Sequence, residues 1–543
     1  MAKNKIFSRI KESKLFKYLS FKTNGSQTPR SDLGIKLLSA LQEKEKQSEG
    51  VDKEIPAETK KASLHPKEQI RQNSFISKST PSKYSYWQFH NGKFSEQREV
   101  VIGFDFGTAC SKVVLQDRQL KKAFAVPFER YGSRNNKYLI PSDLYVYSDG
   151  KLSLSPGGKK IYNLKLSCVQ TPELKLKKDI AAGFDATAFD MSAAYVGLVL
   201  REIREWFDRT KSKDYKHIHI DWQLNIGMPS RSYDDERLYR TIKRMALTGW
   251  NLTISGKDEF YIDGVKEADK ISLNQMEVNS FDADKGQLHP EIVDPVPEII
   301  AEVIGYAHSQ LRHNGMYLLA DIGASTMDVS TFILFDREEE DFYSILHAEV
   351  ERLGAFILHH HRIKELEKIF EDKFLKLKDA CDGISPLPRF DQYLPSLNEN
   401  DKQVFSEANK NFLCKCSRLI RRVVGTTKKR RNPLASEWGN GLPIFLCGGG
   451  SQVELYKNMI KDVEDKLKQT GFGGFNIKIL PRPDNLDAYD IPPSDYHRIA
   501  VSYGLSHSEI DLGKIIPQRD MDDFTCEHSV VDVDKRFVDK DMV

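Results

Sequence analysis

Apolar residues along the chain fall into two patterns. Short strand-like apolar stretches lead into turns at residues 99–103, 217–227, 318–322 and 443–447, and such stretches are typical of buried strands. The first of these stretches, together with residues 112–115, encloses a tight turn and predicts a β-hairpin. Other stretches repeat apolar residues every three or four positions and predict helices. The chain is therefore expected to contain strands that end in glycine turns, with helices between them.

Helical spacing is clearest in two stretches. At 192–209, residues such as Tyr195, Leu198 and Trp206 share one face, which predicts core packing rather than a cofactor site. A second helix is expected after the strand at 217–227 and its Gly-Pro turn, with Ser232 as the N-cap and acidic residues in the first turn. These two helices would belong to the structural core.

Three glycine-bearing turns carry the candidate chemistry. They are VIGFDFGTACSK at 101–112, LLADIGASTMDVSTF at 318–332 and PIFLCGGGSQ at 443–452. Glycines let backbone N–H groups approach phosphate oxygens, and Thr and Ser add hydroxyl donors. In the first two turns an Asp at the strand end can hold a hydrated cation or orient a water molecule. This combination is typical of phosphate binding.

In this order, the three turns resemble the phosphate-one, phosphate-two and adenosine motifs of the actin, heat-shock chaperone and sugar-kinase ATPase superfamily. The resemblance covers roughly residues 98–510. It implies an α/β fold of two actin-like, ribonuclease-H-like lobes with a nucleotide cleft between them, and ATP and Mg²⁺ as cofactors. Lobe I would comprise residues 98–315 and lobe II residues 316–491, with a return helix to lobe I at 492–510.

The resemblance assigns roles within the first turn. Asp105 would contact the hydration shell of Mg²⁺, while Gly107 and Thr108 would donate to the β- and γ-phosphates. Lys112 would supply positive charge, as in the actin form of the motif, whereas the chaperone form lacks this lysine. The alternative for Lys112 is a solvated hairpin lysine.

The second turn is close to the chaperone form, and the roles it implies fall on Asp321, Gly323, Ser325, Thr326 and Asp328. Asp321 would join Asp105 as the second carboxylate at the metal, and Asp328 would be a buried acceptor that stabilises the turn. The residues that would bind phosphates are Gly323, Ser325 and Thr326. Ala324 and Ser325 stand where the family usually has Gly. If Ser325 required a positive φ, the cost would be on the order of 1 kcal/mol.

The third turn would contact the adenosine. Gly448, Gly449 and Gly450 would lie against adenine and ribose, and Ser451 would cap the following helix.

Two further residues are nominated by the resemblance. Glu298 follows Pro297 at the predicted start of a helix, where relatives carry a Glu or Gln that orients water; a carboxylate that merely stabilises the helix dipole is the alternative. Lys165 loosely matches the catalytic lysine of heat-shock ATPases, although Lys159 and Lys160 are also eligible.

Three functions follow from this resemblance. The first is Mg²⁺-dependent ATP hydrolysis, with slow turnover, in a heat-shock-ATPase-like switch whose opening and closing is sensed by a partner. The second is an actin-like filament, favoured by Lys112 and by the expected absence of a peptide-binding domain. The third is a small-molecule kinase, although no substrate-binding polar cluster is recognisable.

Composition sets wide limits on location and partners. The 543 residues are 40% hydrophobic with a net charge of +3, which does not favour nucleic-acid binding by the whole molecule. No apolar run approaches the roughly 20 residues of a membrane-spanning helix. The first residues lack the pattern of a secretory signal, so a cytoplasmic location is expected.

Both ends differ from the centre. Residues 1–97 are rich in Lys, Ser, Gln and Glu and predict a disordered basic arm, and residues 511–543 predict an acidic flexible tail. Within the arm, residues 5–21 form a basic amphipathic pattern that could lie on an anionic membrane or dock to a protein partner. The alternative is a transient helix in a solvated arm.

Three other features are expected to be structural. The seven cysteines do not form a disulfide pattern, and Cys414 and Cys416 are expected to be core or helix-face thiols. The run from His359 to His361 cannot converge on one ion, because consecutive helical side chains diverge by about 100°, and a helix surface is expected. The basic run at 428–431 is expected to be a solvated loop, the alternative being contact with nucleic acid or an acidic partner.

Overall fold

The computed structural model describes residues 96–131, 136–176, 183–279, 281–282, 286–368, 387–393 and 397–523. This part of the chain is mixed α/β, with two large sheets and one small sheet. The predicted amphipathic segment at 5–21, nearly all of the predicted basic arm and most of the predicted acidic tail lie outside these residues. No helix in the described ranges has the length and apolar character needed to cross a membrane.

The first sheet is built around the predicted hairpin. Its strands run in the order β10 (Val293–Pro297), β8 (Ile218–Met228), β1 (Glu96–Asp105), β2 (Cys110–Asp117), β3 (Lys122–Ala125) and β16 (Leu486–Asp487), with β4 (Ile140–Pro141) also paired to β2. β1 and β2 are antiparallel, and Asp105 lies opposite Lys112, which confirms the hairpin. β2 is antiparallel to β3, whereas β8 runs parallel to both of its neighbours, β1 and β10.

The second sheet has the same arrangement at its centre. Its order is β15 (Phe475–Lys478), β14 (Leu442–Cys447), β11 (Gly315–Ile322), β12 (Met327–Arg337), β13 (Glu340–Glu351) and β17 (Lys514–Ile516). β11, β12 and β13 are successively antiparallel, and β11 and β14 are parallel, as are β14 and β15. The five strands β10-β8-β1-β2-β3 of the first sheet therefore have the same spatial order and relative directions as β15-β14-β11-β12-β13 of the second. The β1–β2 turn and the β11–β12 turn occupy equivalent positions.

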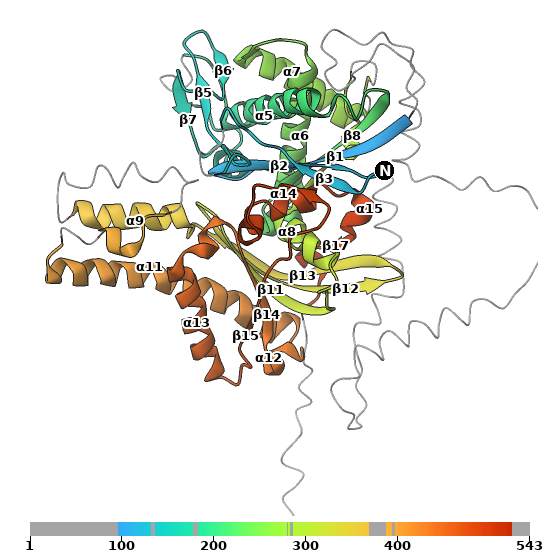
Figure 1. Cartoon of the computed structure of the whole chain (residues 1–543). Helices are drawn as coiled ribbons and strands as arrows, with labels where there is room; N and C mark the ends of the chain where they lie inside the picture. Colours follow the sequence, from blue (N-terminus) through green and yellow to red (C-terminus); the bar gives the residue numbers. More distant parts are fainter. Residues whose placement is uncertain are drawn as a thin grey trace, which may run out of the picture. The chain divides into compact units, whose positions relative to one another are not determined.

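Helices cover the first sheet on its outer side. α5 (Ala188–Lys211), α6 (Glu236–Ile254) and α7 (Ile262–Val278) lie there, near a small sheet of β5 (Leu144–Val146), β6 (Lys151–Ser153), β7 (Lys159–Ile161) and β9 (Phe260–Tyr261) (Figure 1). The helix predicted at 192–209 is confirmed as the central part of α5, and its apolar face is buried in the core. Thr187 and Asp190 form a capping box that fixes its start.

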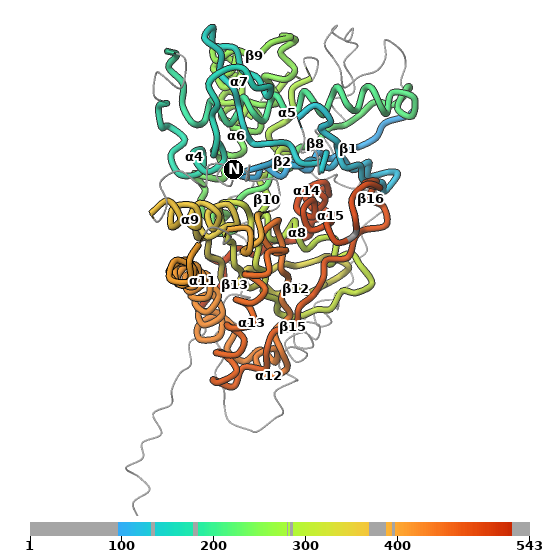
Figure 2. The backbone as a smooth tube through the Cα atoms, turned by 60° about the vertical axis from the view of Figure 1, so that its left-hand side comes forward, coloured from blue at the N-terminus to red at the C-terminus, as the bar shows by residue number. Residues whose placement is uncertain are grey.

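Two helices lie between the sheets. α8 (Glu298–Ala307) and α14 (Ala500–Leu505) pack against each other there, as both views show (Figures 1 and 2). A Cβ on Gly504 would lie 1.8 Å from the carbonyl oxygen of Ala301, so only glycine allows this backbone contact. Asn225 Nδ2 donates to the carbonyl oxygens of Leu505 and His507 at 2.8 and 2.7 Å, which ties α14 to β8.

The other face of the second sheet is covered by α9 (Ala355–Glu367), α11 (Glu399–Thr426) and α13 (Glu454–Lys468), with α12 (Glu437–Asn440) nearby. Alternate residues of β11 pack into the two hydrophobic cores on opposite faces of this sheet. Leu318 and Ala320 pack towards these helices, while Tyr317 and Leu319 pack towards α8 and α14. Both faces of the sheet are therefore buried, which agrees with the continuous apolar run in its sequence.

Several local predictions need correction. Ser232 does not cap α6, because a 3-10 turn, Ser230–Asp234, delays the helix and Asp235 accepts from the amides of Arg237 and Leu238. Pro297 precedes the first helical residue of α8 and is its N-cap.

The histidine run was predicted to be a helix surface, which is wrong for His359. This side chain is buried, with Nδ1 2.7 Å from the Tyr393 hydroxyl, while His361 Nε2 contacts the Ala408 carbonyl oxygen and His360 packs on Phe356. The thiol prediction is confirmed, because Cys414 is exposed on α11 and Cys416 is buried beneath it.

His507 should make stability depend on pH. Burial and the neighbouring His308 lower the pKa of His507 to about 4. The unfolded chain, with a His pKa of about 6.5, takes up the proton first, so this contribution to stability is complete above pH 6.5 and is lost between pH 6.5 and 4. From pH 7 to 5 the free energy of unfolding should fall by about 2 kcal/mol through this group.

Urea unfolding of wild type, His507→Gln and the exposed control His313→Gln at both pH values tests this expectation. The His507 variant should lose about 2 kcal/mol less than wild type on acidification, whereas the control should match wild type. An equal loss in all three proteins would contradict the role of His507.

Candidate functional site

The three glycine turns line one pocket of about 360 Å³. The predicted site residues that line it are Asp105, Gly107, Thr108, Lys112, Lys165, Glu298, Asp321, Gly323, Ser325, Thr326, Gly448, Gly449 and Gly450. Ser451 does not line it. Segments as far apart in sequence as β1 and β14 therefore meet around one space.

The first turn brings a charged pair to the pocket. β1 ends at Asp105, and Lys112 Nζ on the antiparallel partner strand lies 2.7 Å from Asp105 Oδ2. Burial lowers the pKa of Lys112, but Asp105 and other nearby negative groups more than offset this, and the pKa is raised. Lys112 is thus a largely buried cation in the pocket, paired with Asp105, and the solvated alternative is wrong. Ser142 Oγ donates to the Gly107 carbonyl at 2.7 Å and holds the turn.

The second turn is held by the start of α9. The backbone amides of Gly354, Ala355 and Phe356 donate to the carbonyls of Ser325, Gly323 and Ala324 at 3.2, 2.9 and 2.7 Å. Neither Ala324 nor Ser325 has a positive φ. The strain considered for Ser325 therefore does not arise, and its buried side chain lines the pocket.

The third turn approaches the second through glycine. Gly448 has φ of 73°, and a Cβ there would lie 2.1 Å from Asp321 Oδ1. Gly449 differs, because its Cβ would meet only the Arg498 guanidinium at an ordinary 3.6 Å. Ser451 does not cap a regular helix as predicted: it lies in the 3-10 turn Gly449–Gln452, and its hydroxyl donates to the Gly448 carbonyl at 2.8 Å.

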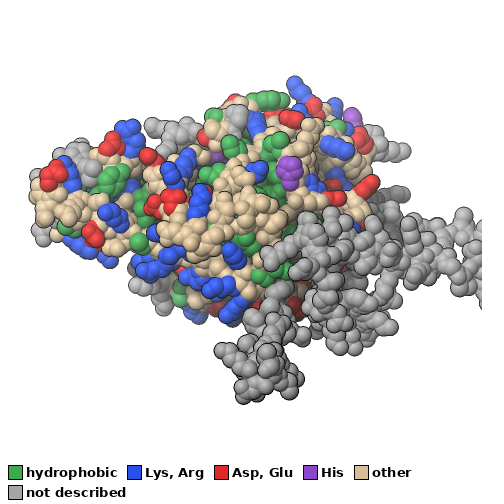
Figure 3. Space-filling view, turned by 90° about the horizontal axis from the view of Figure 1, so that it is seen from below, with side chains coloured by type: hydrophobic (Ala, Val, Ile, Leu, Met, Phe, Trp, Pro, Cys, Tyr) green, Lys and Arg blue, Asp and Glu red, His purple; other side chains and the backbone are tan. Residues whose placement is uncertain are grey.

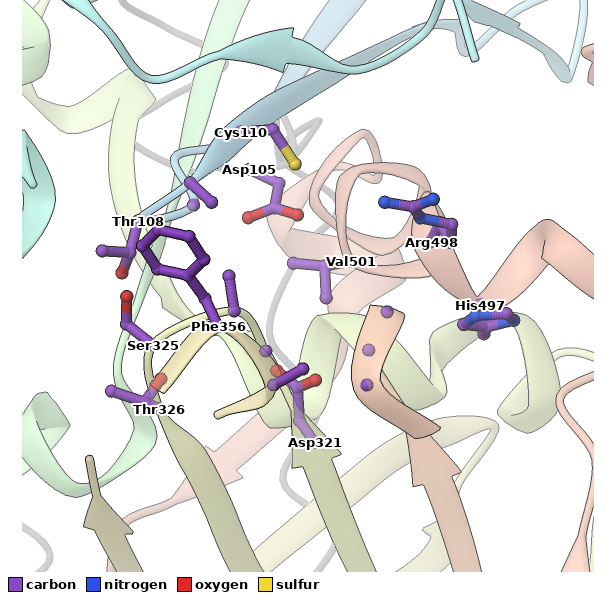
Figure 4. Close-up of a pocket in the computed structure, with 18 of the residues that line it drawn as sticks. Asp105, Thr108, Cys110, Asp321, Ser325, Thr326, Phe356, His497, Arg498 and Val501 are labelled. Carbon is purple, nitrogen blue, oxygen red and sulfur yellow. The ribbon is translucent and has the colours of Figure 1, made fainter. Parts of the chain in front are cut away.

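Two carboxylates face each other across the pocket. Figure 4 shows Asp105 and Asp321 extending into it from opposite sides, with Thr108, Ser325 and Thr326 at one end and His497 and Arg498 at the other. Burial and the charge of Glu298 raise the pKa of Asp321 to about 7. A bound cation would stabilise this carboxylate in its charged form.

Two further acids line the pocket. Burial and Asp321 raise the pKa of both Glu302 and Asp328. Thr326 Oγ1 donates to Asp328 Oδ2 at 3.2 Å, as expected of an acceptor that stabilises the turn. Glu302 Oε1 and Asp328 Oδ1 have no hydrogen-bond partner among the described residues.

Lys165 and Glu298 form a second charged pair. α4 (Leu164–Gln170) presents Lys165, and Glu298 is the first residue of α8; their Nζ and Oε1 atoms are hydrogen-bonded. Both side chains are largely buried. Of the three eligible lysines only Lys165 lines the pocket, whereas Lys159 and Lys160 are exposed on β7. Glu298 is therefore held at the pocket by a cation, which goes beyond a helix-dipole role.

Sequence reasoning missed several lining residues. Glu302 lies four residues after Glu298, so helical spacing could have placed it on the same face. Phe356, His497 and Arg498 had no such signal, since they reach the pocket only through the docking of α9 and the packing of α14.

The donor set suits Mg²⁺ held mainly by water and phosphate. In the described ranges, no three His, Cys, Asp or Glu side chains are placed to enclose a metal ion. Mg²⁺ usually keeps several waters and is bound by one or two carboxylates with substrate phosphates. Asp105 is buried and Asp321 is partly buried, and both line the pocket close to carboxylate oxygens that have no hydrogen-bond partner among the described residues, so the pair fits that requirement.

No protein-family model matches this chain, and no curated protein sequence matches it. The chemistry of the pocket is therefore inferred from its own residues.

Proposed function

We propose that this chain is a Mg²⁺-dependent ATPase with a two-lobe actin-like fold, acting as a nucleotide-dependent conformational switch on a partner protein. The observation that carries the proposal is the meeting of the three glycine turns around one pocket. The repeated order and directions of five strands support duplicated ribonuclease-H-like lobes. The lobes would be centred on the two large sheets.

The pocket offers separate places for the parts of ATP. Gly107 and Thr108 from one sheet, and Gly323 and Thr326 from the other, would donate to the phosphates. Gly448 to Gly450 would lie against adenine and ribose. Asp105 and Asp321 would hold hydrated Mg²⁺, which supplies charge neutralisation of the phosphates when bound.

Glu298 is the best candidate to orient the attacking water. Its Oε1 atom is fixed by Lys165, and its carboxylate can accept a hydrogen bond from water beside the phosphates. Lys165 would also contribute positive charge near the transferred phosphoryl group. Catalysis of phosphoryl transfer depends mainly on such positioning and charge stabilisation.

The switch would follow from the shared pocket. Residues of both large sheets line it, so bound nucleotide would contact both, while α8 and α14 pack between the sheets. Loss of the γ-phosphate would remove contacts from both strand-end turns at once. A partner could sense the resulting change in the spacing of the sheets.

We expect Glu298→Gln and Lys165→Gln each to lower ATP turnover by roughly tenfold to a hundredfold. The first removes the carboxylate that accepts from water, and the second releases that carboxylate from its position. Phosphate release from purified full-length proteins measures the effect. Lys159→Gln is the matched control, because this lysine is exposed on β7. Equal turnover in all four proteins would remove the Lys165–Glu298 pair from the mechanism.

An actin-like filament is the second candidate. Lys112, the feature that distinguishes the actin form of the first motif, lies in the pocket and pairs with Asp105. Sedimentation at rising protein concentration with Mg·ATP separates the two functions, since a filament would pellet and a monomeric switch would not. Phosphate release without an added acceptor would distinguish the switch and the filament, which both hydrolyse ATP, from a small-molecule kinase, which transfers phosphate to a substrate.

A further inference from the structure

The segment at 408–436 carries a strong local positive charge. It contains nine Lys or Arg residues and no Asp or Glu: Lys410, Lys415, Arg418, Arg421, Arg422, Lys428, Lys429, Arg430 and Arg431. The structure places them on α11 and on the π-helical turn η7 (Thr427–Arg431) that continues it. The expected solvated loop at 428–431 is therefore wrong, and the basic run prolongs a helix.

Packing fixes which side of this helix faces outwards. Phe412, Cys416, Ile420 and Val423 are buried against the second sheet, so the exposed basic residues of α11 lie on the opposite side. Arg422 pairs with Glu349 and Glu351. Five exposed residues have no ion partner in the described part of the chain, and we call them the basic face: Lys415, Arg418, Arg421, Lys429 and Arg430. In the view from below, Lys and Arg side chains gather along the lower edge with few acids among them (Figure 3).

The C-terminal segment approaches this surface. β17 pairs with β13, and Gln518 Oε1 then accepts from the Ala348 amide at 3.1 Å. Arg431 donates to the Met521 carbonyl, and its Nε lies 3.3 Å from Asp523 Oδ1. The described chain therefore ends in an ion pair with the residue that closes η7, immediately after Lys429 and Arg430.

We propose that residues 524–534 bind the basic face of their own chain. The stretch 520–534 contains six acids and no Lys or Arg: Asp520, Asp522, Asp523, Glu527, Asp532 and Asp534. Asp523 already lies beside η7, and the later acids complement five cations that lack acidic partners among the described residues. Attachment in the same chain gives the segment a high effective concentration at this surface.

The length of the segment is sufficient. Eleven extended residues span at most about 36 Å, whereas the helical distance from Arg431 back to Lys415 is about 24 Å. Each pair would be exposed and therefore weak alone, so binding should depend on several pairs together and on salt. The segment would thus compete with nucleic acids and other polyanions for the basic face.

Zero-length carbodiimide cross-linking of the full-length protein tests the contact. Glu527, Asp532 or Asp534 should cross-link to Lys415 or Lys429 within one chain, and molar salt should suppress the products. The variant Arg418→Glu, Arg421→Glu, Arg430→Glu should reduce them by about tenfold, because three of the five cations become repulsive. Lys457→Glu, Lys461→Glu, on the exposed side of α13, is the control and should leave them unchanged. Absent or intermolecular products, or equal yields in the charge-reversed variant, would overturn the proposal.

Binding to a DNA duplex gives an independent readout with the same full chain. Glu527→Gln, Asp532→Asn, Asp534→Asn should bind the duplex several-fold more tightly than wild type at low salt, because the basic face is no longer covered. Equal affinities would mean that the segment does not cover it. Tight binding by wild type, unaffected by these substitutions, would instead identify an open nucleic-acid surface and reject the proposal.

Discussion

Replacing Asp105 or Asp321 with Ala is expected to lower phosphate release at least about tenfold. The two carboxylates extend into the pocket from opposite sheets (Figure 4). Each substitution would remove one of the two groups that are proposed to hold the hydrated Mg²⁺. Asp105 also binds Lys112, so its removal frees a buried cation that would otherwise be neutralised. Steady-state phosphate release at saturating Mg·ATP measures both effects.

Stability measurements separate this loss from unfolding. Asp321 is a partly buried acid, and desolvation and the charge of Glu298 both disfavour its ionised form. Its replacement should therefore leave the midpoint of thermal unfolding unchanged or higher, even as activity falls. Asp336→Ala, on β12 but outside the pocket, is the control and should keep full activity. Wild-type turnover in both folded pocket variants would remove these carboxylates from the active site.

The second large effect is expected from Gly449→Val, which should weaken ATP binding by tenfold or more. A Cβ at Gly449 has ordinary contacts with Arg498 and no clash with the backbone, so the fold can accept the side chain. The added methyl groups would then occupy the space proposed for adenine and ribose. Crowding of this kind costs up to about 3 kcal/mol, and a loss of tenfold or more needs at least about 1.4 kcal/mol of it. Isothermal titration with Mg·ATP measures it.

Two other glycines sharpen this test. Gly439→Val is the neutral control, because nothing lies within 4 Å of a Cβ there. Gly448→Ala should instead lower stability, since its Cβ would collide with Asp321 and its φ of 73° disfavours a side chain. Wild-type affinity in the Gly449 variant would mean that the third turn does not contact nucleotide.

Sequence patterns predicted the strands better than the starts of the helices. The hairpin at Asp105 and Lys112 follows from two short apolar runs around a glycine turn, and α5 follows from its apolar spacing. The start of α6 could not be placed, because Ser232 and Asp235 are both good capping residues and the intervening 3-10 turn decides between them. His359 was misplaced because its partner, Tyr393, comes from a separate segment.

The pocket shows a similar division. Residues within glycine turns were found because backbone geometry restricts which side chains can stand there. Lys165 and Glu298 were nominated separately, and only the tertiary structure brings their side chains together. Arg498 could not be found, since its position depends on how α14 packs between the two sheets. Its neighbourhood carries no phosphate-binding pattern.

Photo-cross-linking of the full-length protein with 8-azido-ATP and Mg²⁺ tests the central claim most directly. The azide is attached to the base, which is proposed to lie at the third turn, near Arg498. We predict labelled peptides that contain residues 448–453 or 495–501, with labelling abolished by excess Mg·ATP. Labelling confined to other regions, or labelling that ATP does not displace, would contradict a nucleotide site in this pocket.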